Sequence, residues 1–249
     1  MWRAGVIAVL LAACAAPRPD PVSVSLYQTR SDTPLDAVEI QVTNDGPDPV
    51  TVQRAELRSP RLQGVAAWEE AVEIMPGASV DLKVRLPAPH CETAGDATDQ
   101  VTLTLDGRTV AVAAPDRLGQ VGAYVRQRCF EQAVGQAAVI RVDAVTRRGM
   151  TVFVDPGAAR LGALGTTILF APADPRALAA DPGHAAGVRE VRLTPNRCDA
   201  HALGEDKQGT YFGVEVTLPD GRSGTYTFGV DTAQRAQLYR LYARDCGLS

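Results

Sequence analysis

Two stretches that end in cysteine repeat one pattern, and this repeat limits what the chain can fold into. "VRLPAPHC" at residues 84–91 and "VRLTPNRC" at residues 191–198 place Val-Arg-Leu at the same distance before Cys91 and Cys198. Each copy continues with two strand-like stretches joined by a turn that contains Asp-Gly, then an aspartate, a helix-like stretch and a second cysteine, Cys129 or Cys246. The repeat therefore predicts two modules with the same construction.

The strand-like stretches of both copies alternate apolar and polar residues, which is typical of half-buried β-hairpins. In the first copy, a two-residue turn at Asp106-Gly107 is expected. That turn sets two facing pairs, Leu103 with Val110 and Val101 with Val112. The second copy has a longer loop around residues 219–221, and its expected facing pairs are Phe212 with Val230, Val214 with Phe228, and Val216 with Tyr226.

The closing segment of each copy has the apolar spacing of an amphipathic helix. In the second copy, Asp231 and Gln234 have the spacing of a capping box at the start of a helix. The residues that share one face of this helix are Tyr239, Tyr242, Ala243 and Cys246. The first copy has a similar stripe of Leu118, Val121, Val125 and Cys129, although Gly119 and Gly122 each cost a helix interior about 1 kcal/mol.

The first thirteen residues have the composition of an export signal. Arg3 is followed by the apolar stretch "AGVIAVLLAA", which is about half the length needed to span a bilayer. The junction "LAAC" at residues 11–14 resembles the lipobox of bacterial lipoproteins. This resemblance implies removal of residues 1–13 and attachment of diacylglycerol to Cys14, whereas an ordinary signal peptide with an incidental cysteine is the alternative. Residues 14–21 are rich in proline and are expected to form an extended spacer.

Export to an oxidising compartment makes disulfides the expected role of the other four cysteines. Four cysteines allow three pairings. Because the repeat carries one cysteine before each hairpin and one after each helix, it predicts the pairs Cys91–Cys129 and Cys198–Cys246. The alternative role of Cys246 as a nucleophile is disfavoured, since no histidine lies near it in the sequence.

The stretches ahead of the first repeat motif predict short strands at residues 22–27, 37–43 and 50–57. "VEIQVTNDGPDPVTV" resembles the early strands of immunoglobulin-like modules in bacterial surface proteins. The expected fold is therefore all-β, with two immunoglobulin-like β-sandwich modules at residues 22–132 and 133–249. Each module is expected to carry a C-terminal helix that a disulfide ties back to the sandwich.

Residues 156–187 are rich in glycine, alanine and proline and interrupt the strand pattern of the second copy. They predict a long inserted connection at the surface, with one short strand near residues 168–170. The side chains that could anchor a partner there are Leu161, Leu164, Arg176, Leu178 and His184. The alternative is a linker-like insertion that contacts no partner.

Few side chains that could catalyse a reaction or bind a metal lie close together in this sequence. The stretch "CDAHALGED" gathers Asp199, His201, Glu205 and Asp206, which we expect to form a solvated acidic loop, and a site for a hard cation or zinc is the alternative. The sequence contains none of the common hydrolase, metalloprotease or phosphate-loop motifs, and we expect no cofactor. Its formal net charge of −4 disfavours binding to nucleic acid.

These features predict a lipid-anchored, extracytoplasmic protein of the bacterial cell envelope that binds or scaffolds other molecules without catalysis. The expected partners are the membrane, through the lipid on Cys14, and an envelope protein or glycan. The alternative is an envelope hydrolase or metal-dependent enzyme with its site near residues 199–206.

Overall fold

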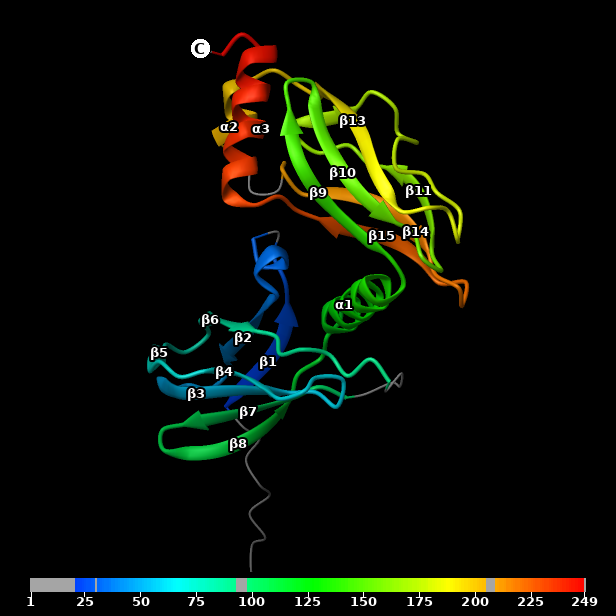
Figure 1. Ribbon diagram of the computed structural model, residues 1–249. Helices are drawn as coiled ribbons and strands as arrows, with labels where there is room; N and C mark the ends of the chain where they lie inside the picture. The colour runs from blue at the N-terminus through cyan, green and yellow to red at the C-terminus, as the bar shows by residue number, and fades with distance from the viewer. Residues whose placement is uncertain (1–20, 30, 93–97, 205–208, 249) are drawn as a thin grey trace, which may run out of the picture. The chain divides into compact units, whose positions relative to one another are not determined.

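The computed structural model describes residues 21–29, 31–92, 98–204 and 209–248 (Figure 1). The leader and Cys14 lie outside the described residues. The chain divides into two compact units, of which unit 1 comprises residues 1–88 with 93–121 and unit 2 comprises residues 89–92 with 122–249. The fold is mostly β, and its strands pair in antiparallel sheets.

Unit 1 contains two antiparallel sheets. The first has the order β1-β2-β6, with β1 (Val22–Tyr27), β2 (Ala37–Asn44) and β6 (Ser79–Arg85), and a short 3-10 helix, η1 (Thr33–Leu35), precedes β2. The second has the order β4-β3-β7-β8, with β5 also paired to β3. Its strands are β3 (Val50–Arg58), β4 (Val65–Trp68), β5 (Val72–Ile74), β7 (Gln100–Leu105) and β8 (Arg108–Ala113). The three early strands predicted from the sequence are confirmed.

Alternate side chains of these strands form the core of unit 1, because successive residues of a strand point to opposite faces of its sheet. Ile40, Val52, Leu57 and Leu103 are all fully buried. The β7–β8 hairpin has the predicted register, with Leu103 opposite Val110 and Val101 opposite Val112. Its turn residues Asp106 and Gly107 have φ angles of 47° and 77°, which suit a tight two-residue hairpin turn.

Unit 2 also contains two antiparallel sheets. One has the order β12-β13-β10-β9, with β9 (Val139–Thr146), β10 (Gly149–Asp155), β12 (Phe170–Pro172) and β13 (Gly187–Pro195). The other has the order β11-β14-β15, with β11 (Arg160–Leu164), β14 (Phe212–Thr217) and β15 (Ser223–Phe228). In the described part of this unit the helices are α1 (Gln120–Ala137), α2 (Ala200–Gly204) and α3 (Thr232–Asp245).

Helix α1 differs from its prediction at both ends. It begins at Gln120, where the carboxylate of Asp116 accepts hydrogen bonds from the backbone N–H groups of Gln120 (2.7 Å) and Val121 (2.9 Å). Leu118 precedes the helix and is 73% exposed. The helix then continues past Cys129 because Phe130 and Val134 are buried in the core of unit 2. The expected module boundary at residue 132 therefore falls inside a helix.

Both predicted disulfides, Cys91–Cys129 and Cys198–Cys246, are present, each with a Cα–Cα distance of 5.3 Å. Because residues 89–92 group with unit 2, both bridges lie in unit 2, whereas the repeat predicted one in each module. The capping box of Asp231 and Gln234 at the start of α3 is also confirmed. Tyr242 of α3 is fully buried, and Cys246 packs partly against the same core.

The predicted register of the second hairpin was wrong by two residues. Phe212 lies opposite Phe228, Val214 opposite Tyr226, and Val216 opposite Gly224. The strands are joined by a loop in which the backbone N–H of Leu218 donates to the carbonyl of Arg222 (2.8 Å), so the loop is shorter than expected. Because the shift is two residues, the apolar side chains keep the predicted face.

Candidate binding hollow

Residues 156–187 do not form the surface insertion that their composition predicted. They form β11 and β12 and contribute seven buried apolar side chains, which are Ala159, Leu161, Leu164, Leu169, Phe170, Leu178 and Ala180. Three of the five predicted contact residues, Leu161, Leu164 and Leu178, are at most 2% exposed and belong to the core. The prediction failed because the buried Leu161 and Leu164 are three residues apart across an irregular stretch, so β11 lacks the alternating pattern of a regular strand.

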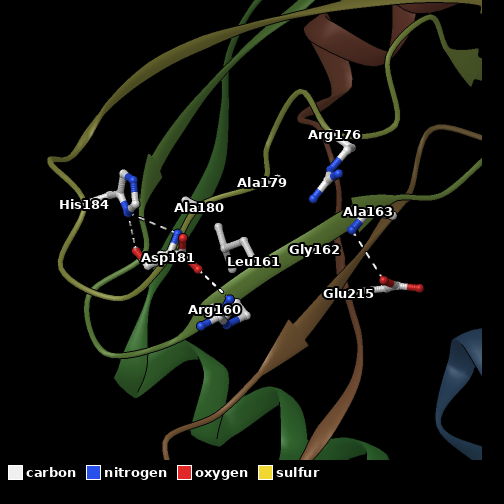
Figure 2. Close-up of a pocket in the computed structure, with 10 residues that line it drawn as sticks. All are labelled: Arg160, Leu161, Gly162, Ala163, Arg176, Ala179, Ala180, Asp181, His184 and Glu215. Carbon is white, nitrogen blue, oxygen red and sulfur yellow. Dashed lines mark hydrogen bonds and ion pairs between the residues drawn. The ribbon is translucent and has the colours of Figure 1, made fainter.

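The other two predicted contact residues, Arg176 and His184, line a surface hollow of about 500 Å³ beside β11 (Figure 2). Two sets of backbone hydrogen bonds bracket this hollow. The N–H of Leu164 donates to the carbonyl of Pro175 (2.7 Å), and Leu161 exchanges hydrogen bonds of 2.8 and 3.1 Å with Ala180. Between these points the chain turns away from β11, with the N–H of Ala179 donating to the carbonyl of Arg176 (2.9 Å). The turn leaves the hollow open.

A break in the pairing of β11 shapes the floor of the hollow. The register of β11 against β14 shifts between Leu161 and Leu164, which leaves Gly162 and Ala163 in an irregular stretch. A Cβ atom at Gly162 would lie only 3.0 Å from the carboxylate of Glu215, so glycine permits that carboxylate to approach the floor. The backbone N–H of Ala163 donates to Glu215 Oε2 (3.4 Å). A negative group therefore borders one side of the hollow.

Most charged groups around the hollow already have partners. Arg160 Nη1 lies 2.6 Å from Asp181 Oδ1, and the ring Nδ1 of His184 lies 3.1 Å from the backbone nitrogen of Asp181. The ion pair is solvent-exposed and contributes at most about 1 kcal/mol. Arg176 differs, since its guanidinium points from its loop toward β11 and makes no hydrogen bond or ion pair with another described residue (Figure 2). Arg176 is thus available to an acidic or polar group of a ligand.

Of the four candidate metal ligands, the structure describes Asp199 and His201. Asp199 Oδ2 accepts a hydrogen bond from Arg197 Nε (2.6 Å), and its Oδ1 accepts one from the backbone N–H of Ala202 (2.6 Å). The contact with Arg197, followed by that with Ala202, holds the pKa of Asp199 below its usual value. No group of three potential ligands occurs among the described residues, and Glu205 and Asp206 lie outside them.

Sequence reasoning missed a charged cluster on the first sheet of unit 1. Lys83 Nζ lies 2.6 Å from Asp32 Oδ1 and 3.2 Å from Glu39 Oε1, and Asp32 is fully buried. Burial alone would raise the pKa of Asp32, but hydrogen bonds from Lys83 and Thr29 outweigh it and hold that pKa below its usual value. The cluster therefore favours the charged state of Asp32, which suits a structural contact that anchors the segment before β2.

A second titratable group on the same sheet has a strongly shifted pKa. The hydrogen bond between Tyr27 and Asp81, followed by burial, raises the pKa of Tyr27 to about 12. The phenol therefore stays protonated at neutral pH. Only the pairing of β1, β2 and β6 brings these side chains together, so no motif in the sequence marks them.

None of the helices in the described ranges is both long and apolar enough to cross a membrane. No protein-family model matches the chain. No curated protein sequence matches it either.

Several solved structures show remote similarity. A FixG-related protein from Vibrio parahaemolyticus is 21% identical, with 38% of this chain and 93% of that chain covered and a TM-score of 0.25. The YadV chaperone is 11% identical, with 84% of this chain and 100% of that chain covered and a TM-score of 0.22. A chain of the CsuC–CsuE chaperone–tip adhesion subunit complex from Acinetobacter baumannii is 10% identical, with 78% of this chain and 91% of that chain covered and a TM-score of 0.20. Similarity at this level assigns no family to the chain.

Proposed function

We propose that this protein is a lipid-anchored binding or scaffolding protein on the extracytoplasmic face of a bacterial cell membrane, and that it has no catalytic activity. The anchor is Cys14 in the lipobox-like "LAAC". Two disulfides support exposure to an oxidising compartment, because disulfides persist there and are rare in the cytosol. The folded part is a framework of immunoglobulin-like sandwiches, supported by the two antiparallel sheets with buried alternate side chains in each unit.

The observation that carries the binding role is the guanidinium of Arg176, which has no partner among the described residues and borders an open hollow on a β framework. Loops held by such frameworks are common binding surfaces. The hollow of about 500 Å³ has the size of known ligand sites, and arginine is enriched among interface residues that contribute most to affinity. Glu215 and Arg176 together provide an acceptor and a donor, which suits a polar chain such as a peptide or a glycan.

Replacing Cys14 with serine is expected to abolish membrane anchoring. Diacylglycerol attached to Cys14 would contribute about 0.8 kcal/mol for each buried methylene, and serine cannot form the thioether. After detergent phase separation, the wild type should enter the detergent phase. The variant should remain in the aqueous phase or retain its uncleaved leader. Equal partitioning of the two proteins would contradict the anchor.

A photo-crosslinking residue at Ala163 is expected to capture the partner in native envelopes. Arg176→Ala should reduce this capture about tenfold, which corresponds to a loss of about 1.4 kcal/mol of binding free energy. The matched control is Arg222→Ala, which removes an exposed arginine that is paired with Asp220. A crosslinker at the exposed Val188 of the other sheet controls for random collisions. Equal capture at Ala163 and Val188, or capture insensitive to Arg176→Ala, would contradict the proposed site.

A further inference from the structure

Two charged side chains of the hollow beside β11 make no ion pair with a described residue, and Arg176 is the first. It lies in the connection between β12 and β13. The acidic residues of this connection have other partners. Asp174 Oδ1 accepts the backbone N–H of Arg176 (2.8 Å), and Asp181 Oδ1 lies 2.6 Å from Arg160 Nη1. The guanidinium of Arg176 therefore keeps its hydrogen-bond donors for a ligand.

Glu215 of β14 is the second of these side chains, and its place in the sheet explains why no cation reaches it. On one side it lies opposite Thr225 of β15. On the other side it lies beside Gly162 of β11, where a Cβ atom would be 3.0 Å from Glu215 Oε2. Its contact in the described chain is a long hydrogen bond from the backbone N–H of Ala163 (3.4 Å). The exposed carboxylate therefore keeps its capacity to accept a ligand's donors.

The two groups enter the hollow from different elements. Figure 2 shows Arg176 pointing in from its loop, whereas Glu215 comes from β14. The lining contains two arginines and two acidic residues, so its formal charges cancel, and Arg160 with Asp181 already forms one ion pair. The hollow thus offers a ligand one cation and one anion rather than a field of a single sign.

The rest of the lining is small. Gly162, Ala163, Ala179 and Ala180 contribute backbone and short side chains, and they leave a volume of about 500 Å³. This volume lies within the usual range of small-ligand sites, which is about 300 to 1,000 Å³. Short side chains at the hollow therefore leave room for a short stretch of peptide between the two charged groups.

Resting on the proposed binding role of this hollow, we propose that its ligand is a short peptide segment that carries one carboxylate and one ammonium group. The guanidinium of Arg176 binds the carboxylate, since its planar fork matches two carboxylate oxygens. The carboxylate of Glu215 binds the ammonium group. The two charges are either the ends of a short peptide or an acidic and a basic side chain of a longer one.

Other polymers match these groups less well. A neutral glycan leaves the charges of both Arg176 and Glu215 without a counter-charge. A polyanion brings further negative groups toward Glu215 and Asp181, and like charges brought together disfavour binding. Electrostatic complementarity therefore favours a ligand that carries both signs of charge.

The experiment measures the affinity of three-residue peptides for the full mature chain in detergent by saturation-transfer NMR. Trialanine with free ends is the first probe, and it should bind with a Kd of about 0.3 mM, as expected for a ligand of this size. Its N-acetylated and C-amidated forms each lack one charge and should bind about tenfold more weakly. Acetyl-Lys-Ala-Asp-amide carries both charges on side chains, and its affinity relative to trialanine identifies the source of the charges.

Two variants assign each contact. Arg176→Gln should weaken trialanine binding about tenfold, and C-amidation should then have no further effect, because the carboxylate has already lost its partner. Glu215→Gln should cancel the effect of N-acetylation in the same way. Both side chains are exposed, so the melting temperature should not change. Arg222→Gln alters an exposed arginine paired with Asp220, and this matched control should bind every peptide as the wild type does.

The inference is overturned if neither trialanine nor the Lys-Asp peptide binds the wild type, or if the caps leave the affinity of trialanine unchanged. It is also overturned if tri-N-acetylchitotriose, a neutral trisaccharide, binds more tightly than both peptides. The binding role itself is tested separately by the crosslinker at Ala163. Capture that depends on Arg176 together with failure of the peptides overturns the peptide class alone, whereas capture insensitive to Arg176→Ala contradicts both.

Discussion

Replacing residues 158–186 with a short Gly-Ser connection is expected to unfold unit 2. The replacement removes β11 and β12 together with seven buried apolar side chains, among them Leu161, Phe170 and Leu178. Truncating a single buried leucine to alanine costs about 2 to 5 kcal/mol. The whole free energy of unfolding of a typical domain is about 5 to 15 kcal/mol, so the combined loss exceeds it.

The unfolding can be followed by differential scanning calorimetry and by limited proteolysis of residues 122–248. The wild type should show a cooperative transition for unit 2, and the replaced variant should lack it. A matched control changes Ala185-Ala186 to Ser-Ser, two exposed residues in the same segment, and should alter the free energy of unfolding by less than about 0.5 kcal/mol. If the replaced variant keeps the transition of unit 2, the segment is not part of the core.

Removing the second disulfide is expected to have the next largest effect. Cys246→Ser should lower the free energy of unfolding of unit 2 by about 2 to 5 kcal/mol, because the bridge closes a loop with a sequence separation of 48 residues. The same region keeps a non-covalent contact, since the hydroxyl of Tyr242 donates to the carbonyl of Arg197 (2.6 Å). Because Cys246 caps the C-terminal end of α3, that end should loosen before the rest of the unit when the bridge is removed.

Chemical denaturation under non-reducing conditions measures this effect. The double variant Cys198→Ser with Cys246→Ser is the control, because both changes remove the same bond and should cost no more than the single change. Hydrogen exchange should increase first in residues 232–246. A single variant as stable as the wild type, or a double variant much less stable than the single one, would show that the bridge does not act as described.

Features that depend on neighbouring residues could be predicted from the sequence alone. The alternation of apolar side chains located β1, β2 and β3, because a strand that is half-buried has a period of two. The turn at Asp106-Gly107 set the register of β7 and β8, since a two-residue loop permits one pairing. Asp231 and Gln234 marked the start of α3, and the repeated cysteine positions predicted both disulfides.

Features that depend on contacts between distant residues could be identified only in the folded chain. Residues 156–187 belong to the core because β14 and β13 pair with β11 and β12, which composition cannot reveal. Helix α1 extends to Ala137 because Phe130 and Val134 are buried in unit 2. The hollow combines Arg160, Arg176 and Glu215 from three separate segments, and no short-range pattern links them. The burial and the charge environment of a side chain depend on the packed fold, so the candidate hollow could be identified only from the structure.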